Sequence, residues 1–168
     1  MGRKHVIIAF VLLGMSFGAT AQSYFSRGMH KTKAYYVEAG GNSILATANF
    51  DKIFYEAELI KISWRVGAGY APLQFFDQDF ENYYTFLFGF NEMFGMRNKY
   101  FEIGFNGSYT HGLPNLFDYL EGDLFLISGN IGFRRQSHDA GLMFRINFTP
   151  YLYPKLLPMV GLSIGQSF

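Results

Sequence analysis

A hydrolase-like pattern lies near the end of the sequence, where Gly161-Leu162-Ser163-Ile164-Gly165 satisfies G-x-S-x-G. In α/β hydrolases this pattern places a nucleophilic serine on a sharp turn between a strand and a helix, and a later histidine acts as its base. No histidine follows Ser163, and apolar residues alternate with small ones through the segment, as in a β-strand. The sequence therefore indicates that Ser163 and its glycine neighbours are spacers that leave room for bulky side chains on adjacent strands.

A second combination that could transfer an acyl group is Ser108 with His111, followed by a loop that carries Asp118, Glu121 and Asp123. A serine nucleophile needs a base within hydrogen-bond reach. In one strand, however, Ser108 points inward while His111 begins the loop. These two residues are catalytic candidates only if the protein is an enzyme, which we do not expect.

Other kinds of site are not indicated. The chain has no cysteine, which excludes thiolate metal sites, disulfides and a lipoprotein anchor. No metal-ligand spacing, phosphate-binding loop or dinucleotide fingerprint occurs in it. Its basic residues are dispersed, unlike those of a nucleic-acid-binding surface. We therefore expect no metal, no cofactor and no nucleic-acid partner.

The elements that carry these residues alternate with the period of a β-strand. The clearest runs from Ile60 to Tyr70, with apolar or aromatic residues at the even positions and Lys61, Ser63, Arg65 and glycines between them. Five later segments of roughly ten residues alternate in the same way. They span residues 84–91, 101–109, 125–134, 142–149 and 159–168.

The composition suits a barrel whose outside is apolar and whose inside is polar. Aromatic residues make up 20% of the chain, with 20 Phe and 12 Tyr, yet the net charge is only +1 and the mean hydropathy +0.06. After the N-terminal region, no apolar segment approaches the roughly 20 residues that a membrane helix needs. The sequence therefore predicts an all-β fold, an eight-stranded antiparallel up-and-down transmembrane β-barrel.

The first residues have the parts of a secretory signal peptide. A basic Arg3-Lys4-His5 precedes an apolar run that ends at about Phe17, and Ala19 and Ala21 form an Ala-x-Ala cleavage site. We expect residues 1–21 to be cleaved, residues 22–33 to form a short periplasmic segment and residues 34–168 to form the barrel.

The number of strands depends on residues 35–51. Tyr35 to Gly41 and Ser43 to Asp51 are two strands if Gly40-Gly41-Asn42-Ser43 is a tight surface turn. The alternative is one long strand kinked at the glycine pair, which would leave seven. A barrel whose two chain ends both lie in the periplasm needs an even number, so parity favours eight.

The lengths of the connections indicate the orientation. If Phe168 is periplasmic, the connections alternate between outside and inside, and the outside ones are generally longer, as in bacterial outer-membrane barrels. The outside connections are residues 149–158, 111–122 and 71–82, and the inside ones are residues 135–139 and 92–99.

Several segments of the sequence resemble those of a family of small, mostly uncharacterised outer-membrane β-barrel proteins. They are Tyr36-Val37-Glu38-Ala39-Gly40-Gly41-Asn42, Trp64-Arg65-Val66-Gly67-Ala68-Gly69-Tyr70, Phe101-Glu102-Ile103-Gly104-Phe105, Phe144-Arg145-Ile146-Asn147-Phe148-Thr149-Pro150 and Gly161-Leu162-Ser163-Ile164-Gly165. The architecture is similar to that of OmpX and the membrane domain of OmpA. The resemblance implies an integral protein of the Gram-negative outer membrane, in contact with its lipids.

The last strand resembles the closing strand of such barrels, which serves as their signal to the outer-membrane assembly machinery. Val160, Leu162, Ile164 and Phe168 supply its apolar face, and Gln166 departs from the pattern. Some eight-stranded barrels modify the acyl chains of lipid A with a serine, a histidine and an acid, but their local motif is not reproduced here.

Five charged residues are expected to face the lumen: Glu38, Lys61, Arg65, Glu102 and Arg145. An eight-stranded barrel is just wide enough to be filled by its own side chains, and charges in so narrow a space must be paired. We expect the two glutamates to pair with the three cations as a plug, and Arg134 to lie at the periplasmic rim. The alternative is a narrow gated channel.

The sequence thus predicts a plugged barrel with a structural or partner-interaction role. Residues 71–82 and 111–122 are unusually apolar for free loops, so we expect them to be buried against each other, against lipid headgroups or against a neighbouring membrane protein. The alternatives are an outer-leaflet enzyme that modifies the acyl chains of lipid A or phospholipids, and a narrow porin-like channel.

Overall fold

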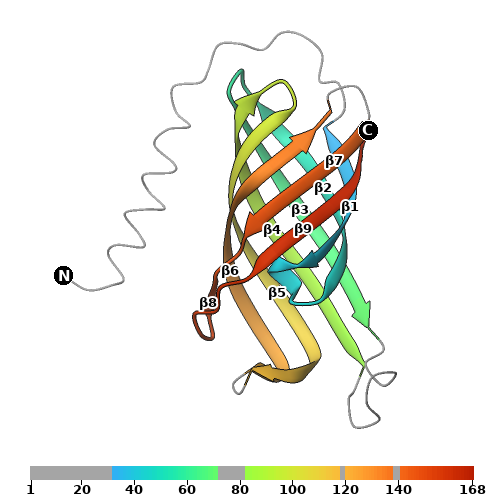
Figure 1. The fold of residues 1–168 in the computed structure, drawn as a ribbon, viewed down its shortest axis with the longest axis vertical. Coiled ribbons are helices and arrows are strands. Elements are labelled where there is room, and N and C mark those ends of the chain that lie inside the picture. Colours follow the sequence, from blue (N-terminus) through green and yellow to red (C-terminus); the bar gives the residue numbers. More distant parts are fainter. Residues whose placement is uncertain (1–31, 72–81, 118–119, 138–140) are drawn as a thin grey trace, which may run out of the picture.

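The computed structural model describes residues 32–71, 82–117, 120–137 and 141–168, which form a closed antiparallel β-barrel (Figure 1). Its strands are β1 (Lys33–Gly40), β2 (Ala46–Glu56), β3 (Ile60–Ala71), β4 (Tyr83–Met96), β5 (Lys99–Phe117), β6 (Leu120–Gln136), β7 (Gly141–Phe148), β8 (Tyr151–Tyr153) and β9 (Val160–Ser167). Strands β1 to β7 pair in chain order, β7 pairs with β9, and β9 pairs with β1 to close the ring. Because β7 and β8 both pair with β6, they form one strand of the wall. The predicted eight-stranded barrel is confirmed.

The N-terminal predictions fall largely outside this region. Residues 1–31 are not among the described residues, so the signal peptide, with its cleavage site at Ala19 and Ala21, remains a prediction. β1 begins at Lys33, the last residue of the expected periplasmic segment. Within the described ranges, no helix is long and apolar enough to cross a membrane.

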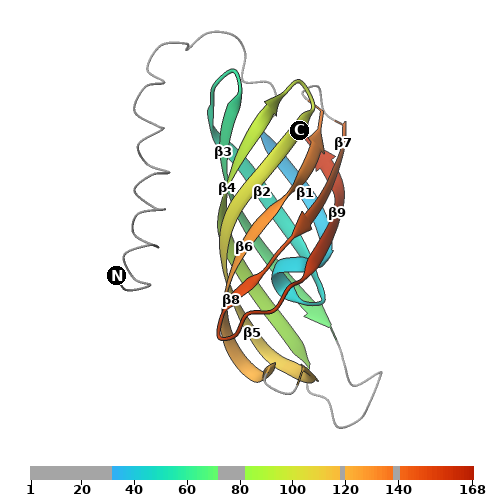
Figure 2. The same cartoon turned by 60° about the vertical axis from the view of Figure 1, so that its left-hand side comes forward.

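The two ends of the barrel differ in their connections. At the end that carries Lys33 and Phe168, called here the Phe168 end, residues 57–59 and 97–98 join successive strands. The opposite end, called the loop end, carries the longer connection from β3 to β4 and the segment from β7 to β9 that includes β8. Figures 1 and 2 show that β3 to β6 reach further at the loop end than β1, β2 and β9.

The first connection differs from its prediction. Residues 33–56 do form two strands, but Gly41–Ser43 is a 3-10 turn, η2, that folds into the barrel instead of lying on its surface. Asn42 is fully buried there. Gly40 and Gly41 have φ angles of 68° and 67°, which residues with a side chain rarely adopt, and a Cβ on Gly41 would lie only 3.0 Å from Cα of Gly161. The two glycines therefore let the chain turn inward against β9.

Two expected connections are in fact strand. β4 continues to Met96, although residues 92–99 were predicted as a turn. β5 continues to Phe117 and β6 begins at Leu120, so most of the predicted loop 111–122 is a hairpin, with Leu113 opposite Gly122 and Phe117 opposite Leu120. The alternation of residues weakens in both places, and backbone pairing with the neighbouring strand extends the element.

The barrel has the inside-out polarity that the sequence predicted. Many large apolar side chains on the outer face are more than a third exposed, among them Phe86, Phe105, Phe125 and Leu142 at 62%, 55%, 56% and 67%. Polar and charged side chains on the alternate positions are buried. Exposed apolar patches on ordinary soluble proteins rarely exceed a few hundred Å². This surface is therefore suited to lipid.

Clusters of buried apolar side chains also lie toward the two ends of the lumen. At the loop end, Ile44 packs with Tyr83, Leu126, Tyr151 and Leu157. At the Phe168 end, two smaller clusters contain Ile53, Met93 and Tyr100, and Ala34, Tyr36 and Met143. The polar centre of the barrel thus lies between two apolar layers.

The seam between β1 and β9 yields a prediction about stability. Gly165 faces Tyr36 in register, and a Cβ there would collide with the carbonyl oxygen of Tyr35 and with Cβ of Tyr36. Gly165→Ala should lower the free energy of unfolding in urea by about 1–3 kcal/mol, the usual cost of overpacking. Gly129→Ala is the matched control, because its Cβ would meet nothing closer than 3.9 Å. Equal effects of the two changes would contradict this account of the seam.

Candidate functional site

Six charged side chains meet inside the barrel and alternate in sign. Ion pairs link Arg65 to Glu38, Glu38 to Arg145, Arg145 to Glu102, Glu102 to Arg134 and Arg134 to Asp51. None of the six side chains has exposed surface. We call this set the lumen charge chain. It contains three arginines and three carboxylates, so its formal charge is zero.

Each member of the lumen charge chain comes from a different strand. The residues lie on β1, β2, β3, β5, β6 and β7 and are, in that order, Glu38, Asp51, Arg65, Glu102, Arg134 and Arg145. Every one occupies an inward position of its strand, because the residues on either side of it are more exposed. The lumen charge chain therefore links opposite sides of the wall across the lumen.

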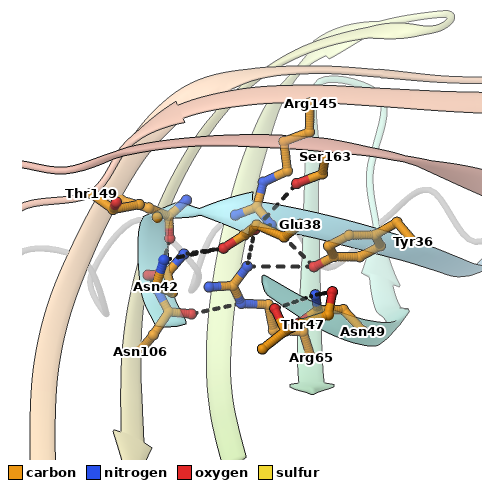
Figure 3. Close-up of polar contacts among 12 residues, drawn as sticks. Tyr36, Glu38, Asn42, Thr47, Asn49, Arg65, Asn106, Arg145, Thr149 and Ser163 are labelled. Carbon is orange, nitrogen blue, oxygen red and sulfur yellow. Dashed lines mark hydrogen bonds and ion pairs between the residues drawn. The ribbon is translucent and has the colours of Figure 1, made fainter. Parts of the chain in front are cut away.

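Glu38 accepts contacts from several strands (Figure 3). Its Oε2 accepts hydrogen bonds from Nη1 of Arg65 at 3.2 Å, Nη1 of Arg145 at 3.4 Å and Oγ of Ser163 at 3.2 Å. Its Oε1 accepts from the backbone N and the side-chain Nδ2 of Asn42, at 3.2 and 3.1 Å. A buried carboxylate needs this many donors to offset its lost hydration.

At the other end of the lumen charge chain, Arg134 makes a bidentate contact with Asp51. Nη1 and Nη2 of Arg134 donate to Oδ2 and Oδ1 of Asp51, both at 3.1 Å, and Ser63 donates to the same carboxylate at 3.1 Å. Arg145 Nη2 lies 2.5 Å from Oε1 of Glu102, which also accepts from Asn130 at 3.0 Å. Paired, fork-shaped contacts of this kind are among the strongest that arginine makes.

Neutral polar side chains connect the turn η2 to the lumen charge chain. Oδ1 of Asn42 accepts from Asn106 at 3.0 Å and from Ser128 at 2.8 Å. Asn106 also accepts from Nε of Arg65 at 2.8 Å and donates to Asn130 at 3.0 Å. The turn that enters the barrel is thus held by the same network that pairs the charges.

Four of the five predicted lumen charges lie in the lumen charge chain, and Lys61 does not. Glu38, Arg65, Glu102 and Arg145 are brought together, whereas the Lys61 ammonium pairs with Glu56 and lies 5.1 Å from the ring centroid of Tyr100. The pairing that was expected between Lys61 and Glu38 or Glu102 is not found. Lys61 lies near the Phe168 end, because residue 61 follows the turn that joins β2 to β3.

The placement of Arg134 at the periplasmic rim is wrong. Its side chain is fully buried and bonded to Asp51. Asp51 and Asn42 were absent from the predicted network. Alternation along β2 could have identified Asp51, since Thr47, Asn49 and Asp51 all fall on the face opposite Phe50. Nothing in the sequence indicated that the turn containing Asn42 folds inward.

The two candidates for acyl transfer, Ser108 and His111, point to opposite sides of the barrel wall. Ser108 is 3% exposed and faces the lumen, whereas His111 faces outward, with its side chain 42% exposed. His111 Nδ1 lies 2.5 Å from Oδ1 of Asp123, and Tyr109 donates to the other carboxylate oxygen at 3.3 Å. Histidine and acid are therefore paired, but the serine lies on the other side of β5.

The remaining candidates have structural positions. Ser163 is buried and donates to Glu38. Val160, Leu162, Ile164 and Phe168, the predicted assembly signal, lie on the outer face and are 58%, 51%, 58% and 38% exposed. In the part of the chain that the structure describes, no group of three or more His, Cys, Asp or Glu residues is placed to hold a metal ion.

Comparisons with known proteins give distant structural similarities. No protein-family model matches the sequence, and no curated protein matches it. The N-terminal β-barrel domain of Pseudomonas aeruginosa OprF is similar in structure, with 12% identity, a TM-score of 0.48 and coverage of 82% of this chain and 98% of that chain.

Two structures of the Yersinia pestis outer membrane protein Ail are also similar. One, in a phospholipid bilayer nanodisc, has 8% identity and a TM-score of 0.46, and covers 82% of this chain and 99% of that chain. The other, a crystal structure, has 7% identity and a TM-score of 0.40, and covers 82% and 97% of the two chains. The assignment of the fold rests on the strand pairings of this chain itself.

Neighbouring arginines on opposite faces of β6 test the energetic role of the lumen charge chain. Arg134→Met leaves Asp51 buried without its main partner, so it should lower the free energy of unfolding by about 3–5 kcal/mol. Arg135→Met is the matched control: this side chain is exposed, and its loss should cost no more than about 0.5 kcal/mol. Fluorescence of Trp64, the one tryptophan of the chain, reports unfolding in urea.

The double variant Asp51→Leu/Arg134→Met sharpens this test. It removes both charges, so it should be more stable than Arg134→Met alone. If Arg134→Met and Arg135→Met were equally stable, the ion pair would not be part of what holds the barrel together.

Proposed function

We propose that this protein is a closed β-barrel of the Gram-negative outer membrane, with a structural or partner-binding role. The observation that carries the proposal is its polarity: an apolar outer face surrounds a fully buried, neutral lumen charge chain. A closed barrel pairs all of its backbone groups within a bilayer. An interior occupied by paired side chains leaves the wall and the loops as the surfaces available for interaction.

Aromatic residues on the outer face support a membrane position. At the Phe168 end, the ring of Tyr35 contacts those of Phe168 and Phe50, with centroids 4.8 and 5.1 Å apart, and Phe50 contacts Trp64 at 5.6 Å. At the loop end, Tyr70 and Tyr84 form a pair at 5.3 Å. Aromatic belts at two levels are typical of membrane barrels. We infer that the Phe168 end faces the periplasm, because its turns are the shorter ones.

The alternative of an acyl-modifying enzyme is disfavoured by geometry. That chemistry requires a serine within hydrogen-bond reach of a base. Ser108 faces the lumen and His111 faces outward, so neither can act on the other. Ser163 lies in the lumen, where it donates to Glu38.

A partner-binding role would fall to the loop end. The hairpin formed by β5 and β6 reaches beyond β1, β2 and β9 (Figure 2). Residues 111–117 and 120–122, the described part of the segment predicted to contact a neighbouring membrane protein, belong to this hairpin. Residues 72–81 of the other predicted contact segment lie outside the described residues. We propose that an outer-membrane or extracellular partner contacts the loop end on the side formed by β3 to β6, where the wall reaches furthest.

Planar-bilayer recordings test the closed lumen. The purified protein should give no conductance above that of the bare bilayer. Arg65→Ala should remain closed as well, because Arg145 still pairs with Glu38 and buried apolar clusters lie toward both ends. Insertion is verified separately by the compact, heat-modifiable band on a gel. Discrete conductance steps in the wild-type protein, changed by Arg65→Ala, would favour the channel alternative.

A further inference from the structure

The outer face of β1, β2 and β9 contains a hollow that the lumen does not explain. Its volume is about 590 Å³, and its outward-facing lining residues are Tyr35, Val37, Ala48, Leu142, Ile164 and Gln166. A second hollow, of about 440 Å³, adjoins it across Tyr35 and Ala48 and extends to Ala68 and Phe86. The hollow exists because Ala48 and its register partner Ala68 are small where the surrounding outward residues are large.

Two unpaired cations lie beside this hollow, toward the Phe168 end. Lys33 and Lys52 face each other directly in the register of β1 and β2, and both are on the outer face. Neither takes part in an ion pair within the region that the structure describes. Like charges directly opposite on a sheet destabilise it. An anion held between the two ammonium groups would remove that repulsion.

A polar side chain lines the hollow on the side nearer the cations. Gln166 is exposed on the outer face and stands opposite Tyr35 in register, at a position where a membrane-facing strand would ordinarily carry an apolar residue. Its amide has both donors and an acceptor to offer. Gln166 therefore places a neutral hydrogen-bonding group one outward position away from Lys33.

The cations, the amide and the hollow follow one another along the barrel wall in the order of the chemical groups of a phospholipid. Outward positions along a strand are two residues, or about 7 Å, apart. From the Phe168 end, β1 presents Lys33, then Tyr35 beside Gln166, then Val37 beside Ala48. The order is cation, amide and apolar hollow. A glycerophospholipid presents a phosphate, an ester group and an acyl chain in the same order.

We propose that this surface is a binding site for an anionic glycerophospholipid of the leaflet at the Phe168 end. The phosphate lies between Lys33 and Lys52, an ester oxygen accepts from the Gln166 amide, and one acyl chain fills the hollow over Ala48. Lys33 is also held over the ring of Phe168, with Nζ 6.0 Å from its centroid. The site rests on the proposed position of the barrel in a membrane.

A second pair of cations provides a matched control. Lys99 and Arg135 are opposite each other in the register of β5 and β6, and both are exposed on the outer face near the Phe168 end. The next outward positions are occupied by Phe101 and Phe133, just as Tyr35 and Phe50 follow Lys33 and Lys52. None of the four residues Lys99, Phe101, Phe133 and Arg135 lines either hollow, and Gln166 lies on β9, away from this pair. This pair therefore carries the same charge without the rest of the site.

Native mass spectrometry of the full-length protein in detergent measures the binding. Phosphatidylglycerol and phosphatidylethanolamine with identical acyl chains are the probes. The wild-type protein should retain one phosphatidylglycerol more tightly than phosphatidylethanolamine. Lys33→Gln/Lys52→Gln should weaken phosphatidylglycerol binding roughly thirtyfold, since each basic group near an anionic lipid contributes about a fivefold effect. Ala48→Phe, which fills the hollow, should weaken the binding of both lipids.

The control variant Lys99→Gln/Arg135→Gln decides between a site and general attraction. It should leave the tightly held phosphatidylglycerol in place. Equal losses in the two double variants would overturn the proposal, because charge alone would then account for binding. Dimers that Ala48→Phe abolishes, in the absence of lipid selectivity, would also overturn it and assign the hollow to a second copy of the chain.

The membrane position and the lipid site can fail separately. All variants are first checked for the heat-modifiable band and for recovery in the outer-membrane fraction. A wild-type protein that passes both checks and shows no preference for phosphatidylglycerol contradicts the lipid site alone. A wild-type protein that is absent from the outer membrane contradicts the proposed function itself.

Discussion

Charge neutrality in a closed lumen is the constraint on which the structure depends. Removing an ion from water costs several kcal/mol even after the protein relaxes, and six ions are buried here. The cost is tolerable because three arginines alternate with three carboxylates, and because serine and asparagine side chains occupy further hydrogen-bonding positions. Because the six residues come from six strands, the lumen charge chain forms only when the whole wall is closed. The neutral charge of the lumen and the closure of the barrel wall therefore depend on each other.

Contacts with the lumen charge chain also explain the position of the first turn and of the apolar cluster at the loop end. The turn at Gly41–Ser43 enters the barrel because Asn42 supplies donors to Glu38 and an acceptor to Asn106 and Ser128. That inward turn brings Ile44 into the apolar cluster at the loop end. With the six charges paired inside, the outward positions are free to be apolar, and the barrel becomes compatible with a bilayer.

Local sequence patterns predicted much of this structure, but they did not predict the contacts that side chains make across the lumen. Alternation of residues identified the wall strands and the inward direction of Glu38, Arg65, Glu102 and Arg145, and parity resolved the strands around Gly40. Periodicity assigns a side chain to a face, but it gives neither its depth nor its partner. Arg134 was therefore placed at the rim, and Lys61 was assigned to the wrong acids. The inward turn depends on Asn106 and Ser128, which are 64 and 86 residues away from Asn42.

Hydrogen exchange of the arginine side chains tests the closed lumen most directly. The protein, labelled with ¹⁵N and held in lipid nanodiscs, is transferred to D₂O, and the Nε–H signals are followed by NMR. The signals of Arg65, Arg134 and Arg145 should persist long after those of the exposed Arg97 and Arg135 have disappeared. Exchange of all five at the same rate would show that water reaches the lumen charge chain, and would contradict a sealed barrel.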